Sequence, residues 1–544
     1  MRKLGCLTVL LAAAACVAVP GGALAATGTV REYTGATAGL ASLAPDQNAP
    51  LTSGPGAMKP RGARRLPHSK TAAAPATSVP RTASLGVSAS APSLRSNFNG
   101  TSSLDSEVTN FNQEFEPPDQ GLCAGNGFVV DMVNSAYTVY RPNGKVVTGP
   151  FNINGPFDEG LTQFTSDPRC YYDAATNTWF ATILFISGGD FGPFGNTSHL
   201  DIAVNTSGDP TNPWTDYQID TTDPKGNGCP CFGDQPRLGI DSQNLYVTDD
   251  EFSINGPQFN GSDIYAFSKK DLVALNPTVH FVHFGDLGIG GAFPPAPQPA
   301  LTTGSPSAEY FLSSLDPNGT FDNRIGLWAM TKTAAVSSGG TPILSSVVLS
   351  SEPYGVPPNA QQRGTTSLLN TGDDRMQQTQ FINGSIWGEL TTAVTIPNDP
   401  AERAGAAWFR VQPQLSGNKV ARGAILQQGY VAVSGRNFFY PALQVAPNGN
   451  AAMVGTLSGS NLYPSASFTA LSSGASAFGS VRVAASGTIN YDPTAGRWGD
   501  YSWAVLDPSG TSFWFATEYV PPKSSQTTDA LKNWGTRVLN VSAG

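Results

Sequence analysis

The sequence predicts an all-β fold, a seven-bladed β-propeller of four-stranded antiparallel blades whose ring is closed by an N-terminal strand. The leading observation is a repeat in which a turn-forming element opens a short strand-like run and a second apolar run follows. Five openings are an Asp, one is Gln-Pro and one is Tyr-Pro, with spacings of 48, 67, 64, 76, 66 and 60 residues. The openings are Asp119, Asp167, Asp234, Gln298, Asp374, Tyr440 and Asp500. One β-unit repeated at this spacing is typical of a radial repeat.

Each repeat is predicted to begin with a β-hairpin. In the second repeat, the run Asp167-Pro-Arg-Cys-Tyr-Tyr precedes the turn Asp173-Ala-Ala-Thr-Asn and the run Thr178-Trp-Phe-Ala-Thr-Ile-Leu-Phe. Asn, Asp, Gly and Pro in such turns supply the positive φ angles and side-chain caps that hairpins need. Third and fourth strands are clearest in the first repeat, at residues 136–140 and 145–148. A β-sandwich also gives regularly spaced strands, but this chain is too long for a single sandwich.

The last repeat has only three strand candidates, the third of which begins at Thr536. We expect residues upstream of Asp119, namely Ser106–Asn112, to supply the missing outer strand. Such a pairing would close the ring and remove its exposed sheet edges.

The N-terminus reads as a secretory signal peptide over residues 1–25. Arg2-Lys3 precedes the apolar stretch from Leu7 to Val19, and Ala23-Leu-Ala precedes the expected cleavage point. Lipidation at Cys16 is the alternative. No other stretch is long and apolar enough to span a bilayer, so we expect a secreted or cell-surface protein.

Residues 26–95 are dominated by Ala, Pro, Ser, Thr and Gly, and we interpret them as a disordered basic linker or propeptide. This segment carries a net charge of +6 and the signal peptide carries +2. Because the whole chain has a net charge of −9, residues 96–544, the propeller domain, carry −17. An acidic body argues against nucleic acid as its partner.

Four cysteines remain after the signal peptide, an even number that suits disulfides in an oxidising compartment. They are Cys123, Cys170, Cys229 and Cys231, and three pairings are open. Cys123 and Cys170 follow the openings of adjacent repeats, so a bridge between neighbouring inner strands is expected. Cys229 and Cys231 would then pair with each other or stay reduced.

Carboxylates and arginines near the repeat openings are the candidate catalytic residues: Asp167, Asp234, Asp374, Arg169, Arg237 and Arg375. Because the first strand of each blade lines the channel of a propeller, the opening residues should gather at one channel mouth. There the carboxylates could do acid–base work while the arginines clamp an anionic group. The structural interpretation is that each Asp caps its turn and bonds the next blade with Arg as its partner. Repetition in most blades favours this structural interpretation.

Two further features have both a functional and a structural interpretation. The clustered carboxylates at Asp249-Asp250-Glu251 and Asp373-Asp374 are candidate Ca²⁺ ligands, although neither has EF-hand spacing. Trp214, Trp498 and Trp534 lie beside turns and are candidate sugar-stacking platforms, with buried packing as the favoured interpretation.

Several segments carry a resemblance to secreted bacterial seven-bladed β-propeller proteins of mostly unassigned function. It covers about residues 105–540 and rests on Pro117-Pro-Asp-Gln-Gly, Ser166-Asp-Pro-Arg, Phe232-Gly-Asp-Gln-Pro-Arg and Arg497-Trp-Gly-Asp-Tyr-Ser. A looser likeness is to sialidase-type propellers and their Asp-boxes. The segment from Asp507 to Trp514 has one residue too many on each side of Gly510 for an Asp-box. The resemblance implies the fold and leaves the activity open.

The sequence favours a secreted, monomeric propeller that binds an extracellular glycan or protein at the channel face. The alternative is a carbohydrate-active enzyme, a sialidase-like glycoside hydrolase or a polysaccharide lyase, that acts on an acidic glycan with the Asp and Arg residues named above. No cofactor is expected apart from the candidate Ca²⁺.

Overall fold

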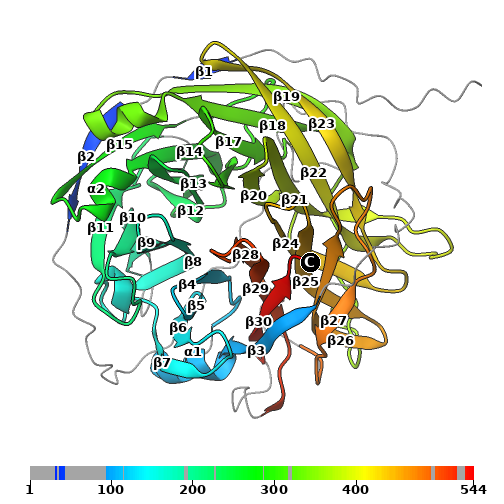
Figure 1. Ribbon diagram of the computed structural model, residues 1–544. Coiled ribbons are helices and arrows are strands. Elements are labelled where there is room, and N and C mark those ends of the chain that lie inside the picture. The colour runs from blue at the N-terminus through cyan, green and yellow to red at the C-terminus, as the bar shows by residue number, and fades with distance from the viewer. Residues whose placement is uncertain are drawn as a thin grey trace, which may run out of the picture.

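The computed structural model describes residues 31–33, 36–42, 93–113, 115–188, 194–225, 228–285, 287–315, 321–491, 497–523 and 533–544. It is an all-β molecule with a propeller-like arrangement of antiparallel sheets around a central axis (Figure 1). Three sheets are separate four-stranded units. The first contains β4 (Gly121–Gly125), β5 (Phe128–Met132), β6 (Ala136–Tyr140) and β7 (Val146–Asn152). The second contains β24 (Asn437–Val445), β25 (Ala451–Gly459), β26 (Leu462–Leu471) and β27 (Arg482–Ala485). The third contains β28 (Trp503–Leu506), β29 (Ser512–Tyr519), β30 (Gly535–Ser542) and β3 (Leu94–Ser102).

The remaining strands form one 18-stranded sheet in which successive strands again pair antiparallel in groups of four. The first group contains β8 (Phe164–Asp173), β9 (Thr178–Gly188), β10 (Phe194–Asn205) and β11 (Thr215–Asp220). The second group contains β12 (Cys231–Ile240), β13 (Asn244–Ser253), β14 (Phe259–Ser268) and β15 (Thr278–Phe284). The third group contains β16 (Gln298–Thr302), β17 (Ala308–Ser313), β18 (Asp322–Thr331) and β19 (Ile343–Tyr354). The fourth group contains β20 (Met376–Ile382), β21 (Ser385–Val394), β22 (Arg403–Ser416) and β23 (Lys419–Val431). Short parallel pairings of β16 with β12 and with β20 join neighbouring groups near the axis.

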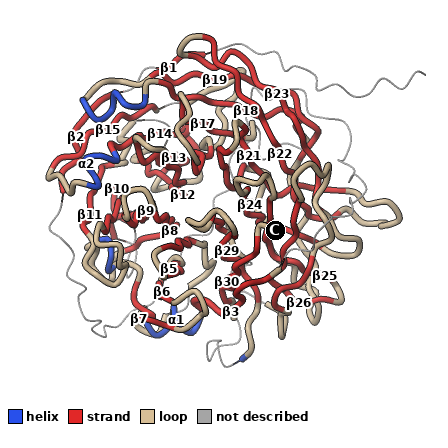
Figure 2. The backbone as a smooth tube through the Cα atoms, in the orientation of Figure 1, coloured by secondary structure: helices blue, strands red, loops and turns tan. Residues whose placement is uncertain are grey.

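Helices are few and short, and Figure 2 shows them at the outer rim of the arrangement. They are α1 (Ser103–Thr109), α2 (Lys269–Val273) and the 3₁₀ turns η1 (Gly155–Phe157) and η2 (Thr333–Ser338). No helix among the described residues is long and apolar enough to cross a bilayer.

The last sheet does take its outer strand from the N-terminal side, but not from the predicted residues. β3 pairs antiparallel with β30, with Phe98 opposite Val538. The prediction of a strand over Ser106–Asn112 is wrong, because most of these residues belong to α1 or to the turn after it. A capping box between Ser102 and Asp105 starts that helix immediately after the strand.

Two short strands lie inside the segment for which the sequence predicts disorder. β1 (Arg31–Tyr33) pairs with β19, and β2 (Ala36–Ser42) pairs with both β11 and β15. At these positions the chain follows the outer edge strands rather than forming a free linker. The predicted signal peptide and most of the predicted linker lie outside the described residues.

A β-bulge sets the direction of side chains at three strand openings. The pairing register shifts between Ser166 and Arg169 and between Asp234 and Arg237, and the same shift follows Phe439. Each bulge holds a residue followed by Pro, and that residue has a positive φ: 60° for Asp167, 51° for Gln235 and 50° for Tyr440. A bulge accommodates Pro, which has no N–H for the ladder, and it re-aims the neighbouring side chain.

The bulges correct the predicted alignment of the repeats. Asp167 corresponds in the fold to Gln235, and Asp234 corresponds to Ser166, one residue earlier. The sequence alignment matched Asp167 with Asp234 because both are the last Asp before a Pro. The structure therefore places different side chains at equivalent points around the axis.

Candidate functional site

The strand openings meet at one end of the axis in a network of hydrogen bonds. Asp119 accepts hydrogen bonds from Asn134 Nδ2, at 2.7 Å, and from the backbone N–H of Asp500, at 2.8 Å. Asn134 Oδ1 accepts from the backbone N–H of Asp167 at 2.8 Å, and Tyr501 donates its hydroxyl to Asp167 Oδ1 at 3.1 Å. These contacts connect the sheet of β4, the 18-stranded sheet at β8, and the sheet of β28.

Arg375 extends the network to two more four-stranded groups, those of β12 and β20. Its guanidinium holds Asp373 through Nε and Nη2, at 2.8 and 2.7 Å, and donates through Nη1 to Gln235 Oε1, at 2.7 Å. The same Nη1 lies 3.1 Å from Asp250 Oδ2. Gln235 in turn donates to Asp500 Oδ2 at 2.9 Å. The pKa of Arg375 is raised, because the nearby carboxylates outweigh the effect of burial.

The other two predicted arginines are also buried in contacts between strands. Arg237 donates to Asp250 Oδ2 at 2.7 Å. The guanidinium carbon of Arg169 lies 3.2 Å from the ring centre of Tyr501 and 4.7 Å from that of Trp503. Burial lowers the pKa of Arg169, and its Nη1 donates to the backbone of Gln120. The three arginines are therefore held in contacts with buried neighbouring residues.

The structure brings some of the predicted carboxylates together and not others. Asp119, Asp167 and Asp500 each offer one oxygen within 4.8 Å of the other two. Gln235, rather than the predicted Asp234, meets Asp500 from the third repeat. Asp374 is fully buried and lies close enough to Tyr354 to raise the pKa of that phenol, after the larger effect of burial.

Burial dominates the electrostatics of this carboxylate cluster. It raises the pKa of Asp119 well above its usual range, and the charges of Asp500 and Asp167 raise it further. Burial likewise raises the pKa of Asp167 and, on β29, that of Glu518. The charge of Arg497, which donates to Asp500 Oδ2 at 2.7 Å, opposes the pKa shifts of Asp119 and Glu518. The cluster has the composition of a general acid or of a cation site.

An apolar cluster packs beside these carboxylates. It contains Tyr440, Tyr491, Trp498 and Trp534, all of them buried, and Tyr440 contacts the network through a hydrogen bond from Ser502 to its carbonyl. Trp498 and Trp534, two of the candidate sugar-stacking platforms, are completely buried, and the third, Trp214, is 4% exposed. The three indoles are therefore buried in the packing of the molecule, which confirms the interpretation that the sequence analysis favoured.

A cavity of about 450 Å³ lies at the opposite end of the first strands. Its wall includes Tyr171, Asp173, Asp241, Gln380, Gln444 and Asp507. Lys269 Nζ, also in the wall, is 3.1 Å from Asp173 Oδ2 and donates to the backbone carbonyl of Asp241. Among the described residues, no hydrogen-bond donor reaches Gln444 Oε1, although this side chain is fully buried. No local pattern predicted this cavity, because its residues come from six different hairpins.

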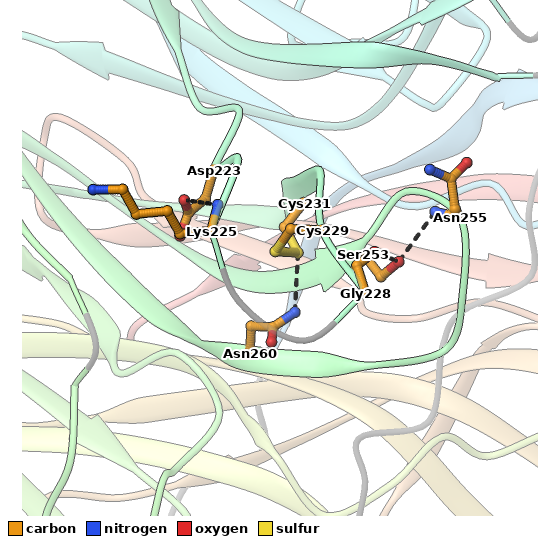
Figure 3. The surroundings of a disulfide bond; sticks show 8 residues. All are labelled: Asp223, Lys225, Gly228, Cys229, Cys231, Ser253, Asn255 and Asn260. Atoms are coloured by element: carbon orange, nitrogen blue, oxygen red, sulfur yellow. Dashed lines mark hydrogen bonds between the residues drawn. A yellow bond between two sulfur atoms is a disulfide. The ribbon is translucent and has the colours of Figure 1, made fainter.

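The four cysteines form two disulfides. Cys123–Cys170 joins β4 to β8, as expected for neighbouring inner strands. Cys229–Cys231 closes on itself beside Asn260, whose Nδ2 lies 2.9 Å from Cys231 Sγ (Figure 3). Both bridges fit an oxidising environment.

The predicted Ca²⁺ positions hold arginine partners. Asp250 accepts from Arg237 and Arg375, and Asp373 accepts from Arg375. The partners Asn134 and Gln235 escaped the sequence analysis, and Asp250 was predicted there only as a Ca²⁺ ligand, because no local pattern marks a side chain that reaches across the axis.

No family model matches this chain, and no curated protein matches it. Solved structures do show similarity. A leech intramolecular trans-sialidase is 10% identical with a TM-score of 0.36, covering 67% of this chain and 68% of its own. A Trypanosoma rangeli sialidase is 9% identical with a TM-score of 0.34, covering 75% and 57%. An α-L-arabinofuranosidase from Fusarium graminearum is 9% identical with a TM-score of 0.33, covering 82% and 97%. At these values the similarities assign no activity.

Proposed function

We propose that the chain is an exported, monomeric seven-bladed β-propeller that binds a glycan in its axial cavity without transforming it. The grouping of successive strands in fours supports the blades, and the pairing of β3 with β30 supports a closed ring. Export is supported by the leader-like residues 1–25 and by the two disulfides.

The axial cavity is the observation that carries this proposal. Its volume of about 450 Å³ falls within the range of roughly 300–1,000 Å³ typical of small-ligand sites. Gln444 Oε1 offers a buried acceptor, and Lys269 with Asp173 offers a charged pair. Sugar hydroxyls both donate and accept hydrogen bonds, so they match this mixture of polar groups.

The predicted catalytic residues support binding over catalysis. Arg169, Arg237 and Arg375 are held between strands, and Asp167 is tied to Tyr501 and Asn134. A group committed to such contacts is poorly placed to exchange them for a substrate. The burial of Trp498 beside the carboxylates supports the same conclusion.

Binding is tested by placing a bulky side chain in the cavity wall. Ser242, in the exposed turn between β12 and β13, lines the cavity, so Ser242→Trp should fill part of it. Ser416→Trp, at an exposed position on β22, is the matched control. We expect glycan-array binding by the natural protein and by Ser416→Trp, with at least a roughly tenfold loss in Ser242→Trp. Equal binding by all three proteins would contradict the proposal.

The carboxylate cluster supports a second candidate function, hydrolysis or elimination on an acidic glycan. Carboxyls a few ångströms apart whose pKa values differ can divide the roles of acid and base between them. In this case Asp119→Asn and Asp500→Asn would abolish release of reducing ends or unsaturated sugars while the melting temperature stayed unchanged. Absence of any release by the natural protein on glycans that it binds would exclude this alternative.

A further inference from the structure

A second group of ionisable side chains lies away from the axis, on the sheet formed by β8 to β11. It consists of Glu159, His199, Asp201 and Asp216, which we call the acidic pocket. Asp201 and His199 belong to β10 and Asp216 to β11, while Glu159 follows η1, which packs against both strands. The proposal below is independent of the glycan site.

Three members of the acidic pocket are in direct contact. His199 Nε2 lies 2.9 Å from Glu159 Oε1 and 3.2 Å from Asp201 Oδ1. Their ligand atoms all fall within 4.8 Å of one another. For metal bonds of about 2.1 Å, ligands at right angles stand about 3.0 Å apart, so this spacing suits one metal ion.

Asp216 joins the pocket from the neighbouring strand. Asp201 pairs with Gln218 and Ala203 pairs with Asp216, so Asp201 and Asp216 are diagonal neighbours on one face of the sheet. The side chain of Asp216 is completely buried. Within the described part of the chain, neither of its oxygens has a hydrogen-bond donor of good geometry.

The charges of the acidic pocket do not balance. Three carboxylates face a single imidazole, and Asp201 is as deeply buried as Asp216. Buried carboxylates without donors are costly unless they are paired or coordinate a cation. Burial, followed by the charges of Asp201 and Glu159, raises the pKa of Asp216 well above its usual range.

We propose that the acidic pocket binds one divalent transition-metal cation, of the Mn²⁺ or Zn²⁺ class, through Glu159, Asp201 and His199, with Asp216 as a buried carboxylate beside these ligands. A nitrogen ligand among carboxylates favours these ions over Ca²⁺, which takes oxygen ligands. The cation would supply the missing positive charge for Asp216.

The surroundings of the pocket hold its outer ligands in place. The ring of His199 stacks on Phe185 with centroids 4.0 Å apart. Gln218 donates to Glu159 Oε1 at 2.8 Å, as a supporting contact of a ligand does. The His199 side chain is 19% exposed, which gives an ion a route from solvent.

The test measures metal binding by the full chain after chelation and removal of the chelator. Titration calorimetry with MnCl₂ or ZnCl₂ should give one site per chain, and elemental analysis after desalting should give the same ratio. Asp216→Asn and Glu159→Gln should each weaken binding roughly tenfold or more. Glu402→Gln, at an exposed carboxylate just before β22, is the matched control and should bind like the natural protein.

Several results would overturn the proposal. One is a folded natural protein that binds neither Mn²⁺ nor Zn²⁺, in which case His199 is simply an ion-pair partner of Glu159 and Asp201. Unchanged affinity in Glu159→Gln is another, and this variant stays informative if Asp216→Asn fails to fold, because Glu159 lies at the edge of the pocket. Binding of Ca²⁺ alone would refute the nitrogen ligand.

Discussion

Among single residues, Arg375 makes the most contacts in the axial network, because its guanidinium contacts Asp373, Gln235 and Asp250 at once. Its role is to neutralise buried carboxylates from different four-stranded groups. Removing one partner from a buried ion pair leaves an uncompensated charge, which is far more destabilising than losing an exposed pair.

We therefore predict that Arg375→Met lowers the free energy of unfolding by about 3–5 kcal/mol. Urea denaturation followed by tryptophan fluorescence would measure the loss. Arg422→Met, at an exposed position on β23, should cost less than about 1 kcal/mol. Similar losses for the two variants would mean that the network contributes little to stability.

Asp131 on β5 makes stability depend on pH. Its side chain is fully buried, and burial raises its pKa from 3.8 to about 7, against a hydrogen bond from the backbone N–H of Thr101 at 2.7 Å. The folded state thus holds a proton that the unfolded state has lost, so this contribution to stability is complete below pH 4 and disappears as the pH rises to about 7.

The variant Asp131→Asn should remove this dependence. The shift corresponds to roughly 4 kcal/mol, so the natural protein should lose up to about that much relative to Asp131→Asn between pH 4 and pH 7. Chemical denaturation at a series of pH values would measure both proteins. A constant difference between them across this range would refute the assignment.

The sequence predicted which residue types gather at the axis better than it predicted their partners. Asp119, Asp167 and Asp500 do meet there. Asp234 gives way to Gln235, because Asp167 directly precedes Pro168 whereas Asp234 lies two residues before Pro236, so the two Asp residues are offset by one position. The partners of Arg375 lie up to 140 residues away in the chain, so only the folded arrangement identifies them.

Among the elements, β3 contacts both the last sheet and the first sheet. It supplies the outer strand of the last sheet, and its backbone at Thr101 also bonds Asp131 of the first sheet. The strand therefore connects the two ends of the repeat. The sequence predicted that an N-terminal strand would do this, but it missed the position, because the capping box that begins α1 was not recognised.

Truncation separates the contribution of β3 from that of the segment before it. A chain that begins at residue 93 keeps β3 and should fold as a monomer. A chain that begins at residue 103 exposes the edge of β30, and we expect it to aggregate or to melt at a markedly lower temperature. Size-exclusion chromatography and thermal unfolding would distinguish the two. Equal behaviour would show that β3 is dispensable.

At the scale of the whole molecule, the repeat in the sequence predicted the four-stranded sheets. Turn-forming openings and alternating apolar runs predicted sheets of four antiparallel strands, and the structure has such sheets. The linking of four groups into one 18-stranded sheet was beyond the sequence, because it depends on β2, which pairs with both β11 and β15, and on the pairings of β16 with β12 and β20. At the contact of β12 with β16 the backbones approach closely, and a Cβ on Gly239 would lie 2.8 Å from the carbonyl oxygen of Ala300.

The disulfide Cys123–Cys170 ties β4 of the first sheet to β8 of the 18-stranded sheet across 47 residues of chain. Replacing both cysteines by Ala should lower the free energy of unfolding by about 2–4 kcal/mol, mainly because the unfolded chain gains freedom. Thermal unfolding of the double variant beside the natural protein would measure this. Reduction with a thiol should destabilise the natural protein more than the double variant, and the opposite order would contradict the prediction.

The axial network has one more consequence. Side chains from five of the four-stranded groups occupy the end of the axis where the first strands begin, while the cavity lies where these strands end. In the proposed function, a glycan would therefore enter from the end of the axis that lies away from the network. The cavity would then hold the free end or a short branch of a glycan chain.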